Sequence, residues 1–372
     1  MKKFLIIFLL LIMTASYAMS EDPINIREFS DTMKGFNNEF LDDYDYEDII
    51  RNIEKGDFKF DYKKIFGRAG KFFIKEIRSN IGLAVQIIVI SLLFGFLDNL
   101  KGNFASDGVA QIAFYVCYIL LVTLIVASFI QIYNVAYGVV FEIEKFMKVL
   151  IPVIFGIVAA MGGITTSSMI YPVLAFSTQF ITMFMTNFLL PVSMIAFVLG
   201  IVSNISDKVS ISKVPNILKS VSLWSMGVIL TLFIGILSLE GTVASTVDGV
   251  TVKTAKFLFS GSVPVVGKLL GDSVDVILGS TLIIKDAIGF IGIAVLFGLA
   301  LVPIIKIIVV IAIYSGLSAI IEPFSDKRIC KCLNDTADAS KMLLGIVVCV
   351  TVMVIIGTVM LLKITNFTSM HG

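Results

Sequence analysis

The stretch TVASTVDGVTVKTAKFLFSGSVPVVGKLLGDSVDVILGSTLIIKDAIG, residues 242–289, decides how the rest of the chain is interpreted. Its second half places apolar residues at the i, i+3, i+4, i+7 spacing of one helical face. This apolar face consists of Val266, Leu269, Leu270, Val274, Ile277, Leu278 and Thr281. The opposite face carries Lys268, Asp272, Asp275 and Gly279. The second half is therefore predicted to be an amphipathic helix.

The first half of this stretch repeats the pattern less regularly, because its many β-branched residues lower helix propensity. Its apolar side consists of Val243, Val247, Val250, Phe257 and Leu258, and Asp248, Lys253 and Lys256 lie off that side. Gly261 and Pro264 between the halves indicate a turn. We therefore predict a hairpin of two amphipathic helices over residues 240–286.

The composition around this hairpin is that of an integral membrane protein. The chain has 372 residues, of which 57% are hydrophobic and 15% charged, and its mean hydropathy is +0.97. A soluble domain is about 45–50% apolar and about 25% charged. The net charge of +1 gives no reason to expect a nucleic acid partner.

The N-terminus has the pattern of an export signal. Lys2 and Lys3 precede the apolar run 4–13, and Ser16-Tyr17-Ala18 resembles a cleavage site. The run is shorter than the roughly 20 residues of a comfortable span. We predict a signal peptide at 1–18, with an uncleaved anchor as the alternative. Either way, the next segment leaves the cytoplasm.

Two segments of opposite charge follow the signal. Residues 19–62 are acidic, which is typical of a solvated tail, and they lack the spacing and turn glycine of a calcium-binding EF-hand. Residues 63–80 are basic, with a cationic stripe opposite aromatic residues. This arrangement predicts a helix in the lipid headgroup layer, bound to anionic lipid. The stripe consists of Arg68, Lys71, Lys75 and Arg78.

The remaining chain predicts an all-α, polytopic bundle of about eight transmembrane helices, with seven or nine as alternatives. Residues 150–202 carry no charge, and at about 1.5 Å per residue they make roughly 80 Å of helix, or two to three crossings. Breaks are expected at Gly162-Gly163, Pro172 and Pro191, an interfacial connection at 133–149, and a division of 287–321 at Pro303 and Lys306. The further predicted spans are 81–97, 109–132, 221–239 and 342–362. They group into a first bundle at 81–239 and C-terminal spans at 287–372.

Charge bias predicts the orientation. The connections 203–220 and 322–341 are rich in Lys and Arg and are expected in the cytoplasm. The hairpin then lies outside, on the same side as the exported N-terminal segment. The basic segment 63–80 would also lie outside, against the same rule.

No catalytic, cofactor-binding or metal-binding constellation is visible, and we do not expect an enzyme. The only histidine is His371, and the four cysteines complete neither a disulfide framework nor a zinc site. Charged residues inside apolar runs are functional candidates by default, although Lys306 also fits a snorkelling side chain. The predicted interaction or pore residues are Asp248, Lys253, Lys256, Lys268, Asp272, Asp275, Lys285 and Lys306.

The hairpin region resembles the stage III sporulation protein AE family of endospore-forming bacteria. The resemblance rests on Val247–Lys256 (VDGVTVKTAK), Val263–Lys268 (VPVVGK), Leu278–Ser280 (LGS) and Lys285–Gly289 (KDAIG). The order of signal peptide, acidic exported segment and polytopic bundle is also similar to that of the family.

This resemblance implies a multi-pass protein of the mother-cell membrane around the forespore. It implies an export-gate or platform role in a secretion-like channel that keeps the forespore competent for late development. The implied partners are the other stage III A-group proteins, including a cytoplasmic ATPase and ring-forming membrane proteins. Stage II sporulation protein Q would complete the connection from the forespore side. The alternatives are a stand-alone permease for a small solute and a non-conducting membrane scaffold.

Overall fold

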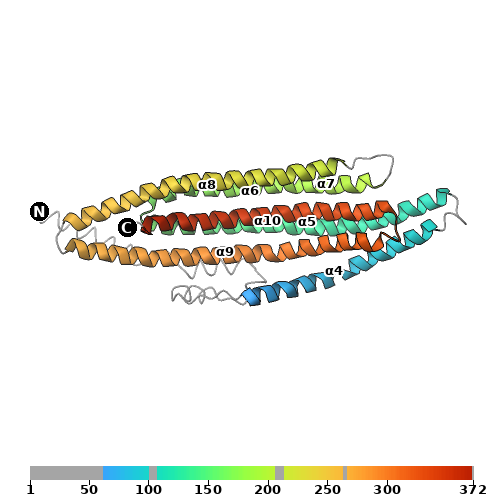
Figure 1. The fold of residues 1–372 in the computed structure, drawn as a ribbon, viewed down its shortest axis with the longest axis horizontal. Helices are drawn as coiled ribbons and strands as arrows, with labels where there is room; N and C mark the ends of the chain where they lie inside the picture. The colour runs from blue at the N-terminus through green and yellow to red at the C-terminus, as the bar shows by residue number, and fades with distance from the viewer. Residues whose placement is uncertain (1–61, 100–106, 206–212, 263–265, 371–372) are drawn as a thin grey trace.

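The computed structural model describes residues 62–99, 107–205, 213–262 and 266–370, and every regular element in these ranges is a helix. The predicted all-α class is confirmed. The helices run side by side along one long axis (Figure 1). They are α4 (Tyr62–Asn99), α5 (Asp107–Ala160), α6 (Ile164–Phe184), the π-helical turn η1 (Met185–Leu189), α7 (Leu190–Ser203), α8 (Lys213–Ser262), α9 (Val266–Ile321) and α10 (Lys327–Met370).

Six helices in the described part are long and apolar enough to cross a membrane, in place of the eight that we predicted. The difference arises where expected breaks are absent. Residues 164–203 form one candidate span of 40 residues, because Pro172 lies inside α6 and η1 leads directly into α7. Pro191 stands in the first turn of α7, where a missing N–H is tolerated, and the π-helical turn absorbs the local mismatch.

Two other predicted interruptions are also helical. Residues 133–149 belong to α5, which is continuous over 54 residues. Pro303 lies inside α9, so Pro303 and Lys306 do not divide that helix. A single proline in a membrane helix is tolerated because neighbouring groups satisfy the carbonyl that loses its donor. Proline was therefore a poor marker of helix ends in this chain.

The glycine pair is the predicted break that the structure confirms. Gly162 adopts a φ of 87°, the left-handed conformation that favours glycine at a helix C-terminus. Its N–H donates to the carbonyl of Ala159, and the N–H of Gly163 donates to that of Val158. These two bonds close α5 and turn the chain directly into α6.

The basic segment 63–80 is not a separate helix, because α4 continues from it into the predicted span 81–97. Phe72 packs against the hydrophobic core of the bundle. Lys71, Lys75 and Arg78 are exposed, and Arg68 is partly buried. The stripe is therefore present, but on the flank of a bundle helix. Whether it binds anionic lipid remains a prediction.

Helix α10 occupies the middle of the bundle, in contact with α9, α8, α5 and α7 (Figure 1). Glycines allow its neighbours to come close. A Cβ atom on Gly357 of α10 would lie 3.0 Å from Phe233 of α8 and 3.3 Å from Leu174 of α6. On the other side, Gly289 of α9 lies directly against the side chain of Leu362.

The helices are longer than a bilayer is thick. At about 1.5 Å per residue, the 50 residues of α8 and the 56 residues of α9 extend over roughly 75 and 84 Å. The hydrocarbon core of a bilayer is about 30 Å thick. Parts of the bundle must therefore project beyond the membrane. The predicted signal peptide 1–18 and the acidic segment 19–62, apart from Tyr62, lie outside the described residues.

Gly95 provides a test of this packing. A Cβ atom there would clash with the carbonyl oxygen of Phe324, in the turn between α9 and α10. Gly95→Ala should therefore separate α4 from this turn and destabilise the protein by about 1–3 kcal/mol, as overpacking does. Thermal unfolding of the purified protein in detergent measures the effect.

Gly82→Ala is the matched control in the same helix, since nothing lies within 4 Å of its added Cβ atom. It should be neutral or slightly stabilising, because alanine is the better helix former. Equal melting temperatures for the two variants would show that α4 does not pack on the α9–α10 turn.

Candidate functional site

The predicted hairpin is built from the ends of two long helices. Helix α8 ends at Ser262 and α9 begins at Val266, and each continues without interruption into a candidate membrane span. Both halves are helical, as predicted, including the β-branched first half. The backbone of Lys253, Lys256, Lys268, Asp272 and Asp275 is helical, but their side chains lie outside the described part of the structure.

Asp248 is a buried helix cap. Its side chain belongs to α8 and is 1% exposed, and its carboxylate accepts hydrogen bonds from the N–H groups of Thr165 (2.9 Å) and Thr166 (2.7 Å). These two residues open α6, whose N-cap residue Gly163 has no side chain to cap the helix. The first N–H groups of a helix lack partners and attract negative charge. Asp248 therefore joins the hairpin to α6 by satisfying that end.

Lys285 joins the hairpin to α10. Its side chain is completely buried in α9, and its Nζ atom donates to the carbonyl oxygen of Leu362 at 3.2 Å. The carboxylate of Asp286 lies 3.3 Å from the same nitrogen and is about half exposed. The charge of Lys285 is thus paired at the edge of the bundle. Because Gly289 lies one turn further along α9, α10 can approach closely enough for this contact.

A second polar cluster lies at the opposite end of the bundle, where α7 ends and α8 and α10 begin. Asn204 donates to the carboxylate of Asp335 at 2.7 Å. Lys219 of α8 lies 2.9 Å from Asp338 of α10. The hydroxyl of Tyr118 in α5 donates to the carbonyl oxygen of Ile201 at 2.8 Å. Four helices are connected here by polar side chains.

These clusters form two polar belts with an apolar layer between them. We call the first the hairpin belt and the second the loop belt. Between them, residues 342–362 of α10 and 220–239 of α8 carry no charge. The two segments are in register, because Gly345 faces Met226 and Gly357 faces Phe233. The hairpin belt consists of Glu240, Asp248, Lys285, Asp286 and Lys363, and the loop belt of Tyr118, Asn204, Lys219, Asp335, Asp338 and Lys341.

The apolar layer has the dimensions of a bilayer. Twenty to twenty-one residues at about 1.5 Å each give roughly 30 Å, which equals the thickness of the hydrocarbon core. Beyond Asp248 of the hairpin belt, the last 14 residues of α8 continue for about another 21 Å. The hairpin therefore forms an arm that extends outside the layer, where its polar face can meet water or partner protein.

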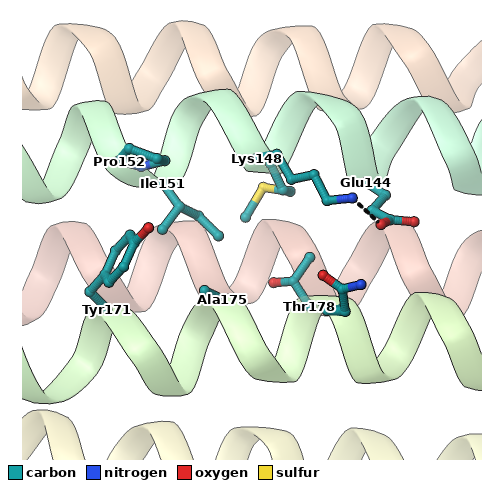
Figure 2. A pocket seen from close by; sticks show the side chains of 9 residues that line it. Glu144, Lys148, Ile151, Pro152, Tyr171, Ala175 and Thr178 are labelled. Carbon is teal, nitrogen blue, oxygen red and sulfur yellow. Dashed lines mark ion pairs between the residues drawn. The ribbon is translucent and has the colours of Figure 1, made fainter.

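A small pocket of about 110 Å³ lies between α5 and α6. Figure 2 shows Ile151, Pro152 and Lys148 of α5 opposite Tyr171, Ala175 and Thr178 of α6. Glu144 and Lys148 form an ion pair of 2.6 Å on its wall. The pocket lies inside the apolar layer, since Leu174, between Tyr171 and Ala175, contacts Gly357 of α10.

The other candidates occupy separate places. Lys306 is partly buried in α9, between the two belts. The structure does not bring it together with Asp248 or Lys285 into one site. In the described part of the chain, no three His, Cys, Asp or Glu side chains are close enough to hold a metal ion.

Sequence reasoning singled out Asp248 and Lys285 but missed the loop belt. The mixture of charged, tyrosine and apolar residues over 133–149 predicted an interfacial connection, whereas these charges pair within the continuous helix α5. The sequence did contain a pattern from which the loop belt could have been predicted. Asp335, Asp338 and Lys341 recur at intervals of three residues, which places them on one side of α10. Their partners Asn204 and Lys219 are more than a hundred residues away along the chain, so pairing required the fold.

Comparisons with known proteins identify the same family as the hairpin motifs. The family described as stage III sporulation protein AE matches residues 44–365. Stage III sporulation protein AE of Bacillus subtilis (strain 168) is 25% identical over 299 residues, which cover 80% of this chain and 75% of that protein. No solved structure matches significantly.

The cap on α6 yields a stability prediction. Asp248→Ala leaves two buried N–H groups without acceptors, at a cost of about 1–3 kcal/mol, and should lower the melting temperature of the protein in detergent. Asp248→Asn keeps one acceptor oxygen but loses the charge, so its effect should be smaller.

Glu240→Ala is the control on the same helix. Glu240 is only partly buried, and it forms no ion pair or side-chain hydrogen bond with the described residues. It should leave the melting temperature nearly unchanged. A loss for Glu240→Ala equal to that for Asp248→Ala would show that the cap has no special role.

Proposed function

The chain belongs to the stage III sporulation protein AE family, and from this premise we propose that it is the multispan platform of a sporulation channel. In this proposal, the protein sits in the mother-cell membrane around the forespore. It joins the cytoplasmic ATPase and the ring-forming proteins of the stage III A group to one assembly. Stage II sporulation protein Q meets that assembly from the forespore side.

The projecting hairpin is the observation that carries this proposal. Its helices are continuous with spans inside the apolar layer and are joined to α6 by Asp248 and to α10 by Lys285. Two buried polar contacts at its base stiffen an arm that would otherwise bend at the membrane surface. A stiff arm of this length suits the docking of partners outside the membrane better than it suits solute uptake.

The orientation that we propose places the hairpin outside the cytoplasm. With an exported N-terminal segment, six crossings put the loops after α7 and α9 in the cytoplasm and the α8–α9 turn outside. The sequence predicted three crossings between residues 150 and 202, and the structure has one candidate span over residues 164–203. Both numbers are odd, so the chain leaves this region on the same side of the membrane in either case. The predicted orientation of the later loops is therefore unchanged. Lys and Arg near the cytoplasmic loops support this orientation.

The pocket between α5 and α6 is the observation that favours the alternative, a permease for a small solute. Its ion pair and the neighbouring Gln179 offer polar contacts inside the apolar layer. The pocket is lined only by residues of α5 and α6, however, and at about 110 Å³ it is too small to connect the two belts. A non-conducting scaffold would need the arm but not the pocket.

A deletion strain tests the proposal. In the proposed role, loss of this protein should leave engulfed forespores that shrink and fail to start late gene expression, because the channel complex cannot form. Forespore volume by microscopy and a late forespore reporter gene are the measurements. Expression of the intact chain should restore both.

Affinity purification from sporulating cells in mild detergent is the accompanying test. The tagged chain should recover other stage III A-group proteins, and the Gly82→Ala variant should recover them equally well. Normal sporulation of the deletion strain, combined with loss of uptake of one solute in growing cells, would contradict the platform role and support the permease.

A further inference from the structure

The outward-facing surface of α5 carries polar and charged side chains, together with the exposed Ile130 and Phe141, at a depth where the neighbouring α6 carries no charge. Its exposed residues recur at intervals of three to five positions, which keeps them on one side of the helix. The opposite side, including Ile132, Val139 and Phe146, is buried in the core. We call the exposed side the polar seam, and it consists of Gln131, Asn134, Tyr137, Glu142, Lys145 and Lys148.

The charges of the seam are paired but remain accessible. Glu142 and Lys145 are 3.1 Å apart, and their side chains are 43% and 50% exposed. Lys145 also lies over the ring of Phe141, 4.7 Å from its centre. Lys148 pairs with Glu144 and is 58% exposed. In each ion pair, the lysine thus keeps at least half of its side chain turned away from the protein.

The seam lies inside the apolar layer. Glu144 and Lys148 share a pocket with Thr178 and Gln179 of α6, which places this part of α5 level with residues 178–179. Helix α6 and the following η1 and α7 carry no charge at all over residues 164–203. The exposed residues of α6 at the same level are the apolar Phe176, Phe180 and Met183 and the uncharged Gln179. One side of the bundle therefore suits lipid and the other does not.

Helix α4 supports the same division. Because α4 and α5 are consecutive antiparallel helices in contact, the exposed Lys71, Lys75 and Arg78 lie at about the level of the first half of the seam. Phe72, among these cations, packs against the core, so this part of α4 stays with the bundle. Charged side chains at the depth of a bilayer face protein or a water-filled path, because lipid cannot solvate them.

We propose that the polar seam of α5 lines a water-filled path within the depth of the membrane. The inference rests on the proposed channel function, for which it supplies a conducting surface. The charged seam residues Glu142, Lys145 and Lys148, taken with the partly buried Glu144 that pairs with Lys148, sum to zero. The path therefore suits water and small hydrophilic solutes. Since one copy encloses no such path by itself, the rest of the wall comes from other subunits.

Cysteine accessibility tests this assignment in the full chain within membranes of sporulating cells. In a variant that lacks the four native thiols and still supports sporulation, single cysteines replace Asn134 or Tyr137, which keeps both ion pairs, and Lys145. Phe180→Cys and Met183→Cys are the matched controls on α6 at the same depth. Small, charged, membrane-impermeant thiol reagents are then applied, one cationic and one anionic.

The seam positions should react about ten-fold or more faster than the α6 positions, because only hydrated thiols form the reactive thiolate. Equal labelling of α5 and α6 would place this depth outside the bilayer and overturn the inference. Absent labelling at the seam would overturn it too, and cross-linking of Lys145→Cys between copies would then identify a dry interface. If the seam positions do not react, the stage III A-group complex is recovered from the same membranes. Its presence would show that only the seam assignment is wrong, and its absence would show that the proposed function itself is wrong.

Discussion

The arrangement of this protein depends on one constraint, which is the cost of placing charge in lipid. Three helices, α6, α8 and α10, keep a layer of roughly 30 Å free of charge, and polar side chains gather at its two edges. At one edge, Asn204 and Lys219 pair with acidic residues of α10. At the other edge, Asp248 and Lys285 join the helices that leave the layer. The belts thus stabilise the helix contacts at the depths where water is available to solvate the remaining charge.

The same constraint explains why α5 is unusual among the long helices. It belongs to the apolar layer by its contacts with α6 and α10, yet it carries ion pairs within that layer. A helix with this pattern suits a bundle that is only one part of a larger assembly. The hairpin arm and the polar seam would then serve different tasks in that assembly, one outside the membrane and one within it.

The sequence predicted the helical class, the glycine turn and the hairpin, because each depends on local patterns. Gly162 and Gly163 end α5 through their own backbone conformation. The described residues form six candidate spans in place of the predicted eight, because proline and charge do not end the helices of this chain. Pro191 is accommodated by a π-helical turn, and the charges near Lys145 pair within one continuous helix. The role of Asp248 was beyond reach, since its partners lie more than eighty residues away and use backbone atoms that carry no sequence signal.

The depth of α8 in a bilayer tests the central claim most directly. Trp224, the only tryptophan, is 75% exposed near the loop belt, and Leu232 and Leu239 are exposed further along the same helix. Quenching of tryptophan fluorescence by lipids brominated at known depths locates each position, with Leu232→Trp and Leu239→Trp made in a Trp224→Phe background. Tryptophan at 232 should lie near the bilayer centre, and tryptophans at 224 and 239 should lie near the two surfaces. Equal depths for all three, or no quenching at 232, would contradict a membrane held between the two belts.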